Sequence, residues 1–169
     1  GDFNKDGFPD LATSLTFSNQ IHLIPGGPAG LAPATLEEIS TTTHPGRIAV
    51  GDLNGDGRLD VAFVTDLGIY KSLNMSGAVF SAPTLVRAGQ YSHLAVGDFS
   101  GDGRVDLAAT DSQNGQVLFV DLTNPESTLV STQGLAPMGI AAGDLNGDLR
   151  GDIIVGNSGE STISIFLHK

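Results

Sequence analysis

Short apolar runs alternate with glycine- and aspartate-rich segments along the whole chain. An apolar run follows each of the four polar segments and begins at Leu11, Val61, Leu107 and Ile153. Another apolar run comes before three of the segments, at residues 48–50, 94–96 and 140–142. Runs of about four small and β-branched residues are typical of strands that are buried on both faces. The pattern therefore predicts strands on both sides of the polar segments.

Two further strands are expected after these. Turn signals follow the second run, and the dipeptide Asn114-Gly115 favours a two-residue hairpin. A third strand is predicted at residues 20–24, 68–73, 116–121 and 162–167. A weaker pattern predicts an outer fourth strand near residues 37–40, 84–87 and 128–131. The sequence thus predicts an all-β protein built from antiparallel sheets of four short strands.

The polar segments are copies of one another. They align without gaps as GDFNKDGFPD, GDLNGDGRLD, GDFSGDGRVD and GDLNGDLRGD. Their first aspartates lie 50, 46 and 46 residues apart, which is a period typical of the four-stranded blades of a β-propeller. We place four blades in a single repeat array, at approximately residues 1–46, 47–92, 93–138 and 139–169.

Each repeat carries an oxygen-rich loop of the form Asp-x-Asn/Ser-x-Asp-Gly-x-x-Asp, in which the sixth residue varies once. Side-chain oxygens at positions 1, 3, 5 and 9 and the backbone carbonyl at position 7 can surround calcium, which accepts about 6–8 oxygens. The loops lack His and Cys, which argues against zinc and copper, and magnesium demands a stricter octahedron. The sequence predicts up to four Ca²⁺ ions, with the ligands Asp2, Asn4, Asp6, Phe8, Asp10, Asp52, Asn54, Asp56, Arg58, Asp60, Asp98, Ser100, Asp102, Arg104, Asp106, Asp144, Asn146, Asp148, Arg150 and Asp152.

An EF-hand begins in the same way but needs a glutamate at position 12. That position holds Thr13, Phe63, Ala109 and Val155, and the flanking runs are strand-like, so an EF-hand is rejected. Position 6 is glycine in three copies, where the backbone turns sharply. The fourth copy has Leu149 there, and leucine is strained in the left-handed region. We expect this site to be the weakest or differently shaped.

The stretch IAVGDLNGDGRLDVAFV, at residues 48–64, and its three counterparts resemble the FG-GAP/VCBS repeat family, the calcium-binding blades of integrin-α-type propellers. The resemblance covers nearly the whole chain. It implies that each loop joins the innermost strand of a blade to the second strand, in a ring of seven or eight blades. The chain has the length of about three and a half blades. We therefore expect a partial propeller, which belongs to a longer protein or is completed by another copy of the chain.

Most of the negative charge belongs to the loops. The formal net charge is −11, and twelve of the 19 acidic residues are loop aspartates. Four divalent cations would leave a net charge of about −3. Basic residues are scattered singly, so no nucleic-acid binding is expected. The chain has no apolar run of the length that a membrane span needs, and it has no cysteine.

Three further features could carry chemistry but are assigned none. The four histidines, His22, His44, His93 and His168, fall at non-equivalent places in the repeat, so no catalytic residue is predicted. The tripeptide Arg150-Gly151-Asp152 resembles an adhesive motif, but Asp152 is position 9 of a predicted metal loop. Asn74-Met75-Ser76 is a glycosylation acceptor pattern that matters only in a secreted eukaryotic protein.

These observations lead to three functional hypotheses. The first is an extracellular, calcium-stabilised propeller that binds protein or glycan ligands, as the resemblance to adhesion and sugar-binding modules implies, with calcium in a structural role. The second is a part, catalytic or not, of a secreted polysaccharide-degrading enzyme. The third is a structural or engineered blade fragment that self-assembles. We expect the chain itself not to be an enzyme.

Overall fold

A computed structural model of the protein describes residues 1–33, 37–124, 127–132 and 134–168. The chain divides into two compact units, Gly1–Gln90 and Tyr91–Lys169, which are described separately. Within the described residues nearly all regular structure is strand, and η1 (Thr16–Ser18) is a short 3-10 turn. The predicted all-β fold of antiparallel blades is therefore confirmed.

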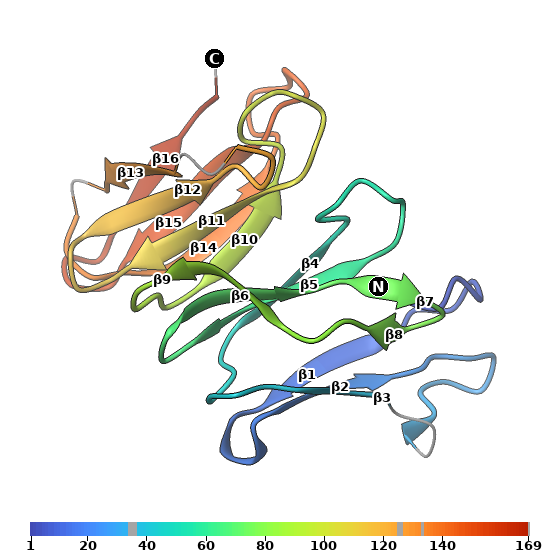
Figure 1. The fold of residues 1–169 in the computed structure, drawn as a ribbon. Coiled ribbons are helices and arrows are strands. Elements are labelled where there is room, and N and C mark those ends of the chain that lie inside the picture. Colours follow the sequence, from blue (N-terminus) through green and yellow to red (C-terminus); the bar gives the residue numbers. More distant parts are fainter. Residues whose placement is uncertain (34–36, 125–126, 133, 169) are drawn as a thin grey trace. The chain divides into compact units, whose positions relative to one another are not determined.

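The first unit contains two larger sheets and one small hairpin (Figure 1). The first sheet has the order β1 (Leu11–Leu15), β2 (Gln20–Ile24) and β3 (Glu37–Ser40). The second has the order β4 (Ile48–Gly51), β5 (Asp60–Thr65), β6 (Gly68–Ser72) and β9 (Thr84–Ala88). The hairpin consists of β7 (Asn74–Ser76) and β8 (Val79–Phe80). Neighbouring strands in each sheet are antiparallel, as in propeller blades.

The second unit contains two sheets. One has the order β10 (Leu94–Gly97), β11 (Asp106–Asp111), β12 (Gln116–Val120) and β13 (Ser127–Ser131). The other has the order β14 (Pro137–Gly143), β15 (Asp152–Asn157) and β16 (Thr162–Phe166). Figure 1 shows the sheet of β14, β15 and β16 beside that of β10, β11 and β12.

The strand register shows how the polar segments are held. Gly51 pairs with Asp60, Gly97 with Asp106 and Gly143 with Asp152, so three of the segments are hairpin connections between the first two strands of a sheet. The fourth begins at Gly1, whose carbonyl accepts a 2.6 Å hydrogen bond from the N–H of Asp10. Each segment thus lies at the same end of its sheet.

In each unit a cluster of buried apolar side chains from both larger sheets packs together. In the first unit Ile21 and Leu23 of β2 are clustered with Val61 and Phe63 of β5. In the second unit Val117 of β12 is clustered with residues of β15. Complete burial of such a side chain contributes about 1.5–3 kcal/mol to stability. The apolar runs recognised in the sequence are therefore strands whose buried side chains pack the two larger sheets of a unit against each other.

Two turns differ from expectation. Asn114-Gly115 is not a two-residue hairpin, because Asp111 pairs with Gln116 and the connection has four residues. The Asp111 carboxylate accepts the backbone N–H of Gln113 and of Asn114, which stabilises the longer turn. The hairpin β7–β8 was not predicted, since its five strand residues carry no clear alternation of apolar and polar side chains.

Candidate metal centres

Four equivalent loops, here called the Asp loops, contain the predicted calcium ligands. They are loop 1 (residues 2–10), loop 2 (52–60), loop 3 (98–106) and loop 4 (144–152). In each loop the aspartate at position 1 accepts backbone N–H groups from its own loop. In loop 2, Asp52 Oδ1 accepts from Gly55 at 2.8 Å, and Asp52 Oδ2 accepts from Gly57 at 2.7 Å. The first carboxylate therefore holds the backbone in a tight turn.

The side chains at positions 3 and 5 continue this turn. Asn54 Oδ1 accepts the N–H of Asp56 at 3.0 Å, and Asp56 Oδ1 accepts the N–H of Arg58 at 2.9 Å. Loops 1 and 4 repeat both bonds within 0.1 Å. Loop 3 repeats the second bond only, through Asp102 and Arg104. The three side chains at positions 1, 3 and 5 thus wrap around one short stretch of backbone.

Two residues of every Asp loop adopt the left-handed backbone conformation. Position 6 has φ of 89°, 79° and 82° at its three glycines and 68° at Leu149, which confirms that this leucine is forced into that region. Position 4 is also left-handed; it is glycine in three loops and Lys5, with φ 60°, in the first. The requirement at position 4 was missed from the sequence, although the three glycines there were a visible signal.

The aspartate at position 9 has a different environment from the other predicted ligands. Asp60 and Asp152 are fully buried, and Asp10 and Asp106 are nearly so. Asp60 Oδ2 accepts the N–H of Leu53 at 2.9 Å, and Asp60 Oδ1 accepts the N–H of Asn74 at 2.7 Å. One carboxylate therefore ties position 2 of its loop to the second residue after β6.

Loops 1 and 4 repeat this arrangement, whereas loop 3 does not. Gly26 donates to Asp10 Oδ1 at 2.7 Å, and His168 donates to Asp152 Oδ1 at 2.8 Å. In loop 3, Asp106 Oδ2 accepts two N–H groups, from Phe99 and Ser100, while the buried Asp106 Oδ1 has no hydrogen-bond partner. Loop 3 is therefore the one with an unsatisfied buried carboxylate oxygen among the four.

The electrostatics follow from burial and hydrogen bonding. Burial raises the pKa of Asp60 and of Asp106 above the usual value for aspartate, against the effect of their backbone hydrogen bonds. The N–H of Leu149 is the main cause that lowers the pKa of Asp144, at position 1 of loop 4. In loop 2 the guanidinium of Arg58 forms an ion pair with Asp56. The lowered pKa of Asp144 favours the ionised form of this carboxylate.

The Asp loops supply some of the oxygen ligands that a hard cation such as calcium needs. Side-chain oxygens at positions 1, 3 and 5 gather on one turn in loops 1, 2 and 4, and those at positions 1 and 5 do so in loop 3. Oxygens are the ligands that calcium prefers. Within the described residues, however, no three His, Cys, Asp or Glu side chains converge as a compact metal cluster. The buried aspartate at position 9 accepts hydrogen bonds from backbone N–H groups. The metal-binding roles of that carboxylate and of the position-7 carbonyl stay predictions.

Other candidate residues are used structurally. Asn74 is fully buried, and its Nδ2 donates to the carbonyls of Phe3 and Leu59, so the acceptor residue of the glycosylation pattern is enclosed by the fold. Asp152 of the adhesive-like tripeptide is fully buried as well. His44 is paired with Asp66 at 2.8 Å on the surface, and His22 lies 3.5 Å from Glu38. None of these features adds a residue to the Asp loops.

The family assignment agrees with this geometry. The model of the FG-GAP-like repeat matches residues 2–63 and 98–155, which is well over half of the chain and includes all four Asp loops in full. The chain belongs to the FG-GAP-like repeat family. No curated protein sequence matches it.

Solved structures with the same fold show the architecture of these FG-GAP-like repeats. A chain in the complex of BBS1N with ARL6DN has a TM-score of 0.66 at 14% identity, and 100% of this chain covers 55% of that one. A chain in the Nidogen/Laminin complex has a TM-score of 0.66 at 15% identity, with 92% and 56% covered. An Agrocybe aegerita lectin that recognises non-reducing terminal N-acetylglucosamine has a TM-score of 0.58 at 18% identity, with 88% and 46% covered.

These neighbours are β-propeller proteins, so the predicted fold class is confirmed. The FG-GAP-like chain spans about half the length of the chains that it matches. In the part of the chain that the structure describes, no helix has the length and apolar character needed to cross a membrane.

Proposed function

We propose that this chain is part of a calcium-stabilised, extracellular β-propeller that binds protein or glycan ligands. The observation that carries the calcium part is the repetition of one loop geometry four times, each with two carboxylates near the solvent on one turn. Like charges this close repel one another, and a bound divalent cation removes the repulsion. Loops 1, 2 and 4 add an asparagine oxygen at position 3, and loop 3 adds Ser100.

Calcium would act as a structural ion here. The residues at positions 1, 3 and 5 of each Asp loop would hold it, with further oxygens from positions 7 and 9. Positions 1 and 5 already fix the turn through backbone N–H groups, so the cation would stabilise an existing conformation rather than create one. Because it binds the folded loop and not the unfolded chain, it adds directly to the free energy of unfolding.

The binding role follows from the family and the fold. FG-GAP-like repeats are generally binding modules rather than catalysts and are typically extracellular. The similar solved structures include complexes with proteins and a lectin that recognises a sugar. A propeller presents loops on a rigid frame of sheets, which suits recognition of a ligand. Calcium in the medium outside a cell is abundant enough for weak sites of this open kind.

Further blades, from the same protein or from another copy, would complete the ring. Strands β2, β6 and β12 each pair with one more strand on their outer side, whereas β16 has no such neighbour within the described residues. Its sequence, Thr162–Phe166, has no charge, Pro or Gly that would discourage pairing. This open edge supports association with another β-strand.

Calorimetry and a glycan array test the two parts of the proposal. Titration of Ca²⁺ into chelator-treated protein is expected to give saturable binding, and a heat signal no larger than that of Mg²⁺ would contradict a calcium site. A glycan array probed in the presence of calcium is expected to show a limited set of positive sugars if the ligand is a glycan. An array without signal, together with capture of a defined protein ligand, would assign the protein-binding alternative.

A further inference from the structure

In three of the four sheets the aspartate at position 9 accepts an N–H group from an equivalent residue of its own sheet. The donors are Gly26, Asn74 and His168, at 2.7, 2.7 and 2.8 Å. Each donor comes two residues after the strand residue that pairs with the first residue beyond the loop. The acceptor is Oδ1 in all three cases. The fold therefore provides one fixed place for a nitrogen donor beside this carboxylate.

The third sheet lacks this donor, although its own chain passes the same place. The register puts Leu122 at the equivalent position, because Leu107 pairs with Val120. Within the described residues, however, Asp106 Oδ1 has no hydrogen-bond partner, and Asp106 is only 2% exposed. A buried carboxylate oxygen without a donor is unfavourable. This oxygen is therefore suited to a donor that the sheet itself does not supply.

A turn at Asp121 explains why the donor is missing. Asp121 Oδ1 accepts the N–H of Thr123 at 2.7 Å and the N–H of Asn124 at 3.0 Å. An aspartate that binds backbone N–H groups two and three residues further on stabilises a turn, here directly after β12. The equivalent residues of the other three sheets have no carboxylate: they are Pro25, Leu73 and Leu167. The different path of the chain is therefore a property of this one sheet.

The same turn places a second carboxylate near the unpartnered oxygen. Asp106 and Asp121 both line a pocket of about 370 Å³, together with Ser100 and Asn124. The two carboxylates are close enough for the charge of Asp121 to act on Asp106. Like charges at such a separation repel each other, and a positive group between them removes the repulsion. This side of the pocket therefore favours a cation.

The other side of the pocket is apolar. Phe99 and Phe119 line it, with ring centroids 5.8 Å apart and an interplanar angle of 76°. The two rings therefore form a corner rather than a flat wall. A bare metal ion would make no use of such a wall, whereas a carbon chain that carries a positive group would pack against it. The pocket thus combines an acidic side with an apolar side.

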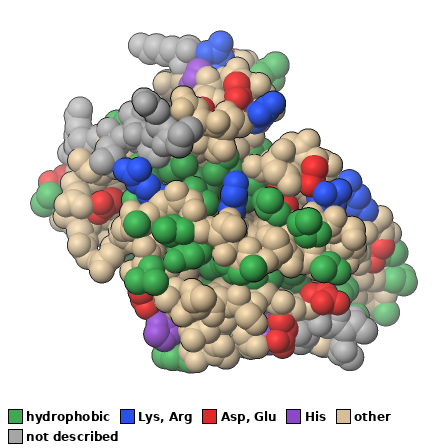
Figure 2. Space-filling view, in the orientation of Figure 1, with side chains coloured by type: hydrophobic (Ala, Val, Ile, Leu, Met, Phe, Trp, Pro, Cys, Tyr) green, Lys and Arg blue, Asp and Glu red, His purple; other side chains and the backbone are tan. Residues whose placement is uncertain are grey.

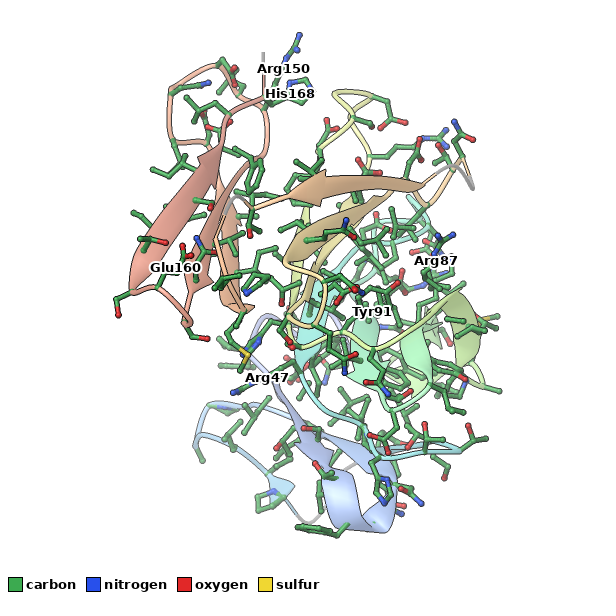
Figure 3. All side chains as sticks on the ribbon, turned by 90° about the vertical axis from the view of Figure 1, so that its left-hand side faces the viewer. Arg47, Arg87, Tyr91, Arg150, Glu160 and His168 are labelled. Atoms are coloured by element: carbon green, nitrogen blue, oxygen red, sulfur yellow. The ribbon has the colours of Figure 1, made fainter. Side chains whose placement is uncertain are left out.

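The neighbouring arginines do not supply this positive group. Arg104 is exposed, and among the described residues that line the pocket none is basic. Hydrogen bonds from Thr123, and to a smaller extent the charge of Arg104, lower the pKa of Asp121 and so favour its ionised form. Arg150 Nη1 lies 3.0 Å from His168 Nδ1 instead, at the end of the adjacent sheet (Figure 3). The acidic side of the pocket is therefore left to a ligand.

We propose that this pocket binds a primary ammonium group on an aliphatic carbon, as in a lysine side chain or an amino sugar. The nitrogen takes the place that an N–H donor occupies in the other three sheets, against Asp106 Oδ1. Asp121 balances its charge, and the attached carbons pack against the two phenylalanine rings. The inference names the group that the binding module recognises on a protein or glycan ligand, and so rests on the proposed function.

The test compares charged probes with neutral ones of the same shape. Nα-acetyl-lysine methylamide and glucosamine are titrated in chelator into the whole protein with ¹³C-labelled phenylalanine. Saturable shifts of the ring signals of Phe99 and Phe119 are expected, with those of Phe3 and Phe80 unchanged. Nα-acetyl-norleucine methylamide and N-acetylglucosamine are expected to bind about tenfold to a hundredfold more weakly, because a hydrogen bond to a charged group is lost. A response to the lysine probe alone assigns a protein ligand, and a response to glucosamine alone assigns a glycan.

A matched pair of variants separates the pocket from a general effect of charge. Asp121→Asn keeps an oxygen for the N–H groups of the turn but removes the charge, and should weaken binding of the lysine probe several-fold. Asp111→Asn makes the same change at another turn of this sheet, where Asp111 Oδ1 accepts the N–H of Gln113 and of Asn114. Asp111 does not line the pocket, so this variant should bind like the wild type. Thermal unfolding checks that both variants are folded.

Three outcomes would overturn the proposal. The first is equal binding of the lysine and norleucine probes, or no binding of either ammonium probe. The second is equal weakening by Asp121→Asn and Asp111→Asn. The third is displacement of the lysine probe by Ca²⁺ in the Asp98→Ala protein, whose loop 3 lacks its first ligand, which would assign the pocket to a metal ion. A protein that binds calcium or a glycan normally but neither ammonium probe would contradict this inference alone, since the calorimetry and the glycan array test the proposed function separately.

Discussion

The backbone N–H of Asn74 lies 2.7 Å from Asp60 Oδ1, and this hydrogen bond joins the end of a third strand to the last residue of an Asp loop. The same carboxylate also accepts the N–H of Leu53. Both oxygens of Asp60 are therefore used, at a site that is fully buried. In loop 3 the corresponding aspartate, Asp106, leaves one buried oxygen without a partner.

This difference gives the first prediction. Asp60→Asn places an NH₂ group against one of two backbone donors and is expected to destabilise the fold by about 1–3 kcal/mol, the cost of leaving a buried donor unpaired. Asp106→Asn keeps an acceptor for both of its donors and removes a buried charge, so its effect should be smaller. Urea unfolding in chelator measures both without a contribution from metal. An equal loss of stability in the two variants would contradict the assigned hydrogen bonds.

The second prediction concerns Leu149. Its φ of 68° costs about 1–2 kcal/mol for an L-residue, and its side chain is 92% exposed, so little packing is lost on removal. Leu149→Gly is expected to raise the stability by about 1 kcal/mol, and Gly103→Leu, at the same position of loop 3, should lower it. Thermal unfolding in chelator provides the measurement, and a destabilising Leu149→Gly would show that the leucine is held by contacts that outweigh the strain.

The third prediction is the effect of removing calcium. A ligand present at 100 times its dissociation constant stabilises the folded state by about 2.7 kcal/mol per site. Chelator is therefore expected to lower the midpoint of thermal unfolding by several degrees, and excess Ca²⁺ should restore it. Asp52→Ala removes position 1 of loop 2 and should reduce the stabilisation by calcium. An unchanged midpoint in chelator would mean that the Asp loops are not stabilised by metal.

The fourth prediction concerns Asn74. Its buried Nδ2 donates to the carbonyls of Phe3 and Leu59, so Asn74→Ala should destabilise the first unit by about 1–3 kcal/mol. Because the side chain is fully buried, expression of the wild type in a glycosylating host should add no glycan at this position. Mass spectrometry of the peptide that contains Asn74 checks this. A glycan found there would show that the residue is modified before the fold closes around it.

The sequence predicted the strands well because the repeat supplied four copies of the same pattern. The runs that begin at Val61 and Ile153 are central strands, and the left-handed conformation of Leu149 follows from alignment with three glycines. The hairpin β7–β8 was missed because it occurs once, so no other copy supports it. Its five residues also alternate poorly between apolar and polar.

The candidate site was predicted in composition but not in arrangement. Asp60 was taken as a metal ligand from its spacing alone, and spacing cannot show that its carboxylate accepts the N–H of Asn74, fourteen residues further on. The pocket beside Asp106 was not foreseen either, because it depends on the turn that Asp121 forms after β12. Apolar side chains at the surface, visible on the face in Figure 2, likewise cannot be distinguished from buried ones by periodicity in such short strands.

The aspartate at position 9 has a consequence for how the blades open. In loops 1, 2 and 4 it links the start of the loop to a residue just after β2, β6 or β16, so the loop and the end of that strand are expected to open together. Amide hydrogen exchange at Leu53 should then follow the opening of the whole blade rather than local fluctuation of its loop. In the third sheet, where this link is missing, exchange near the end of β12 should be faster than exchange in the strands before it.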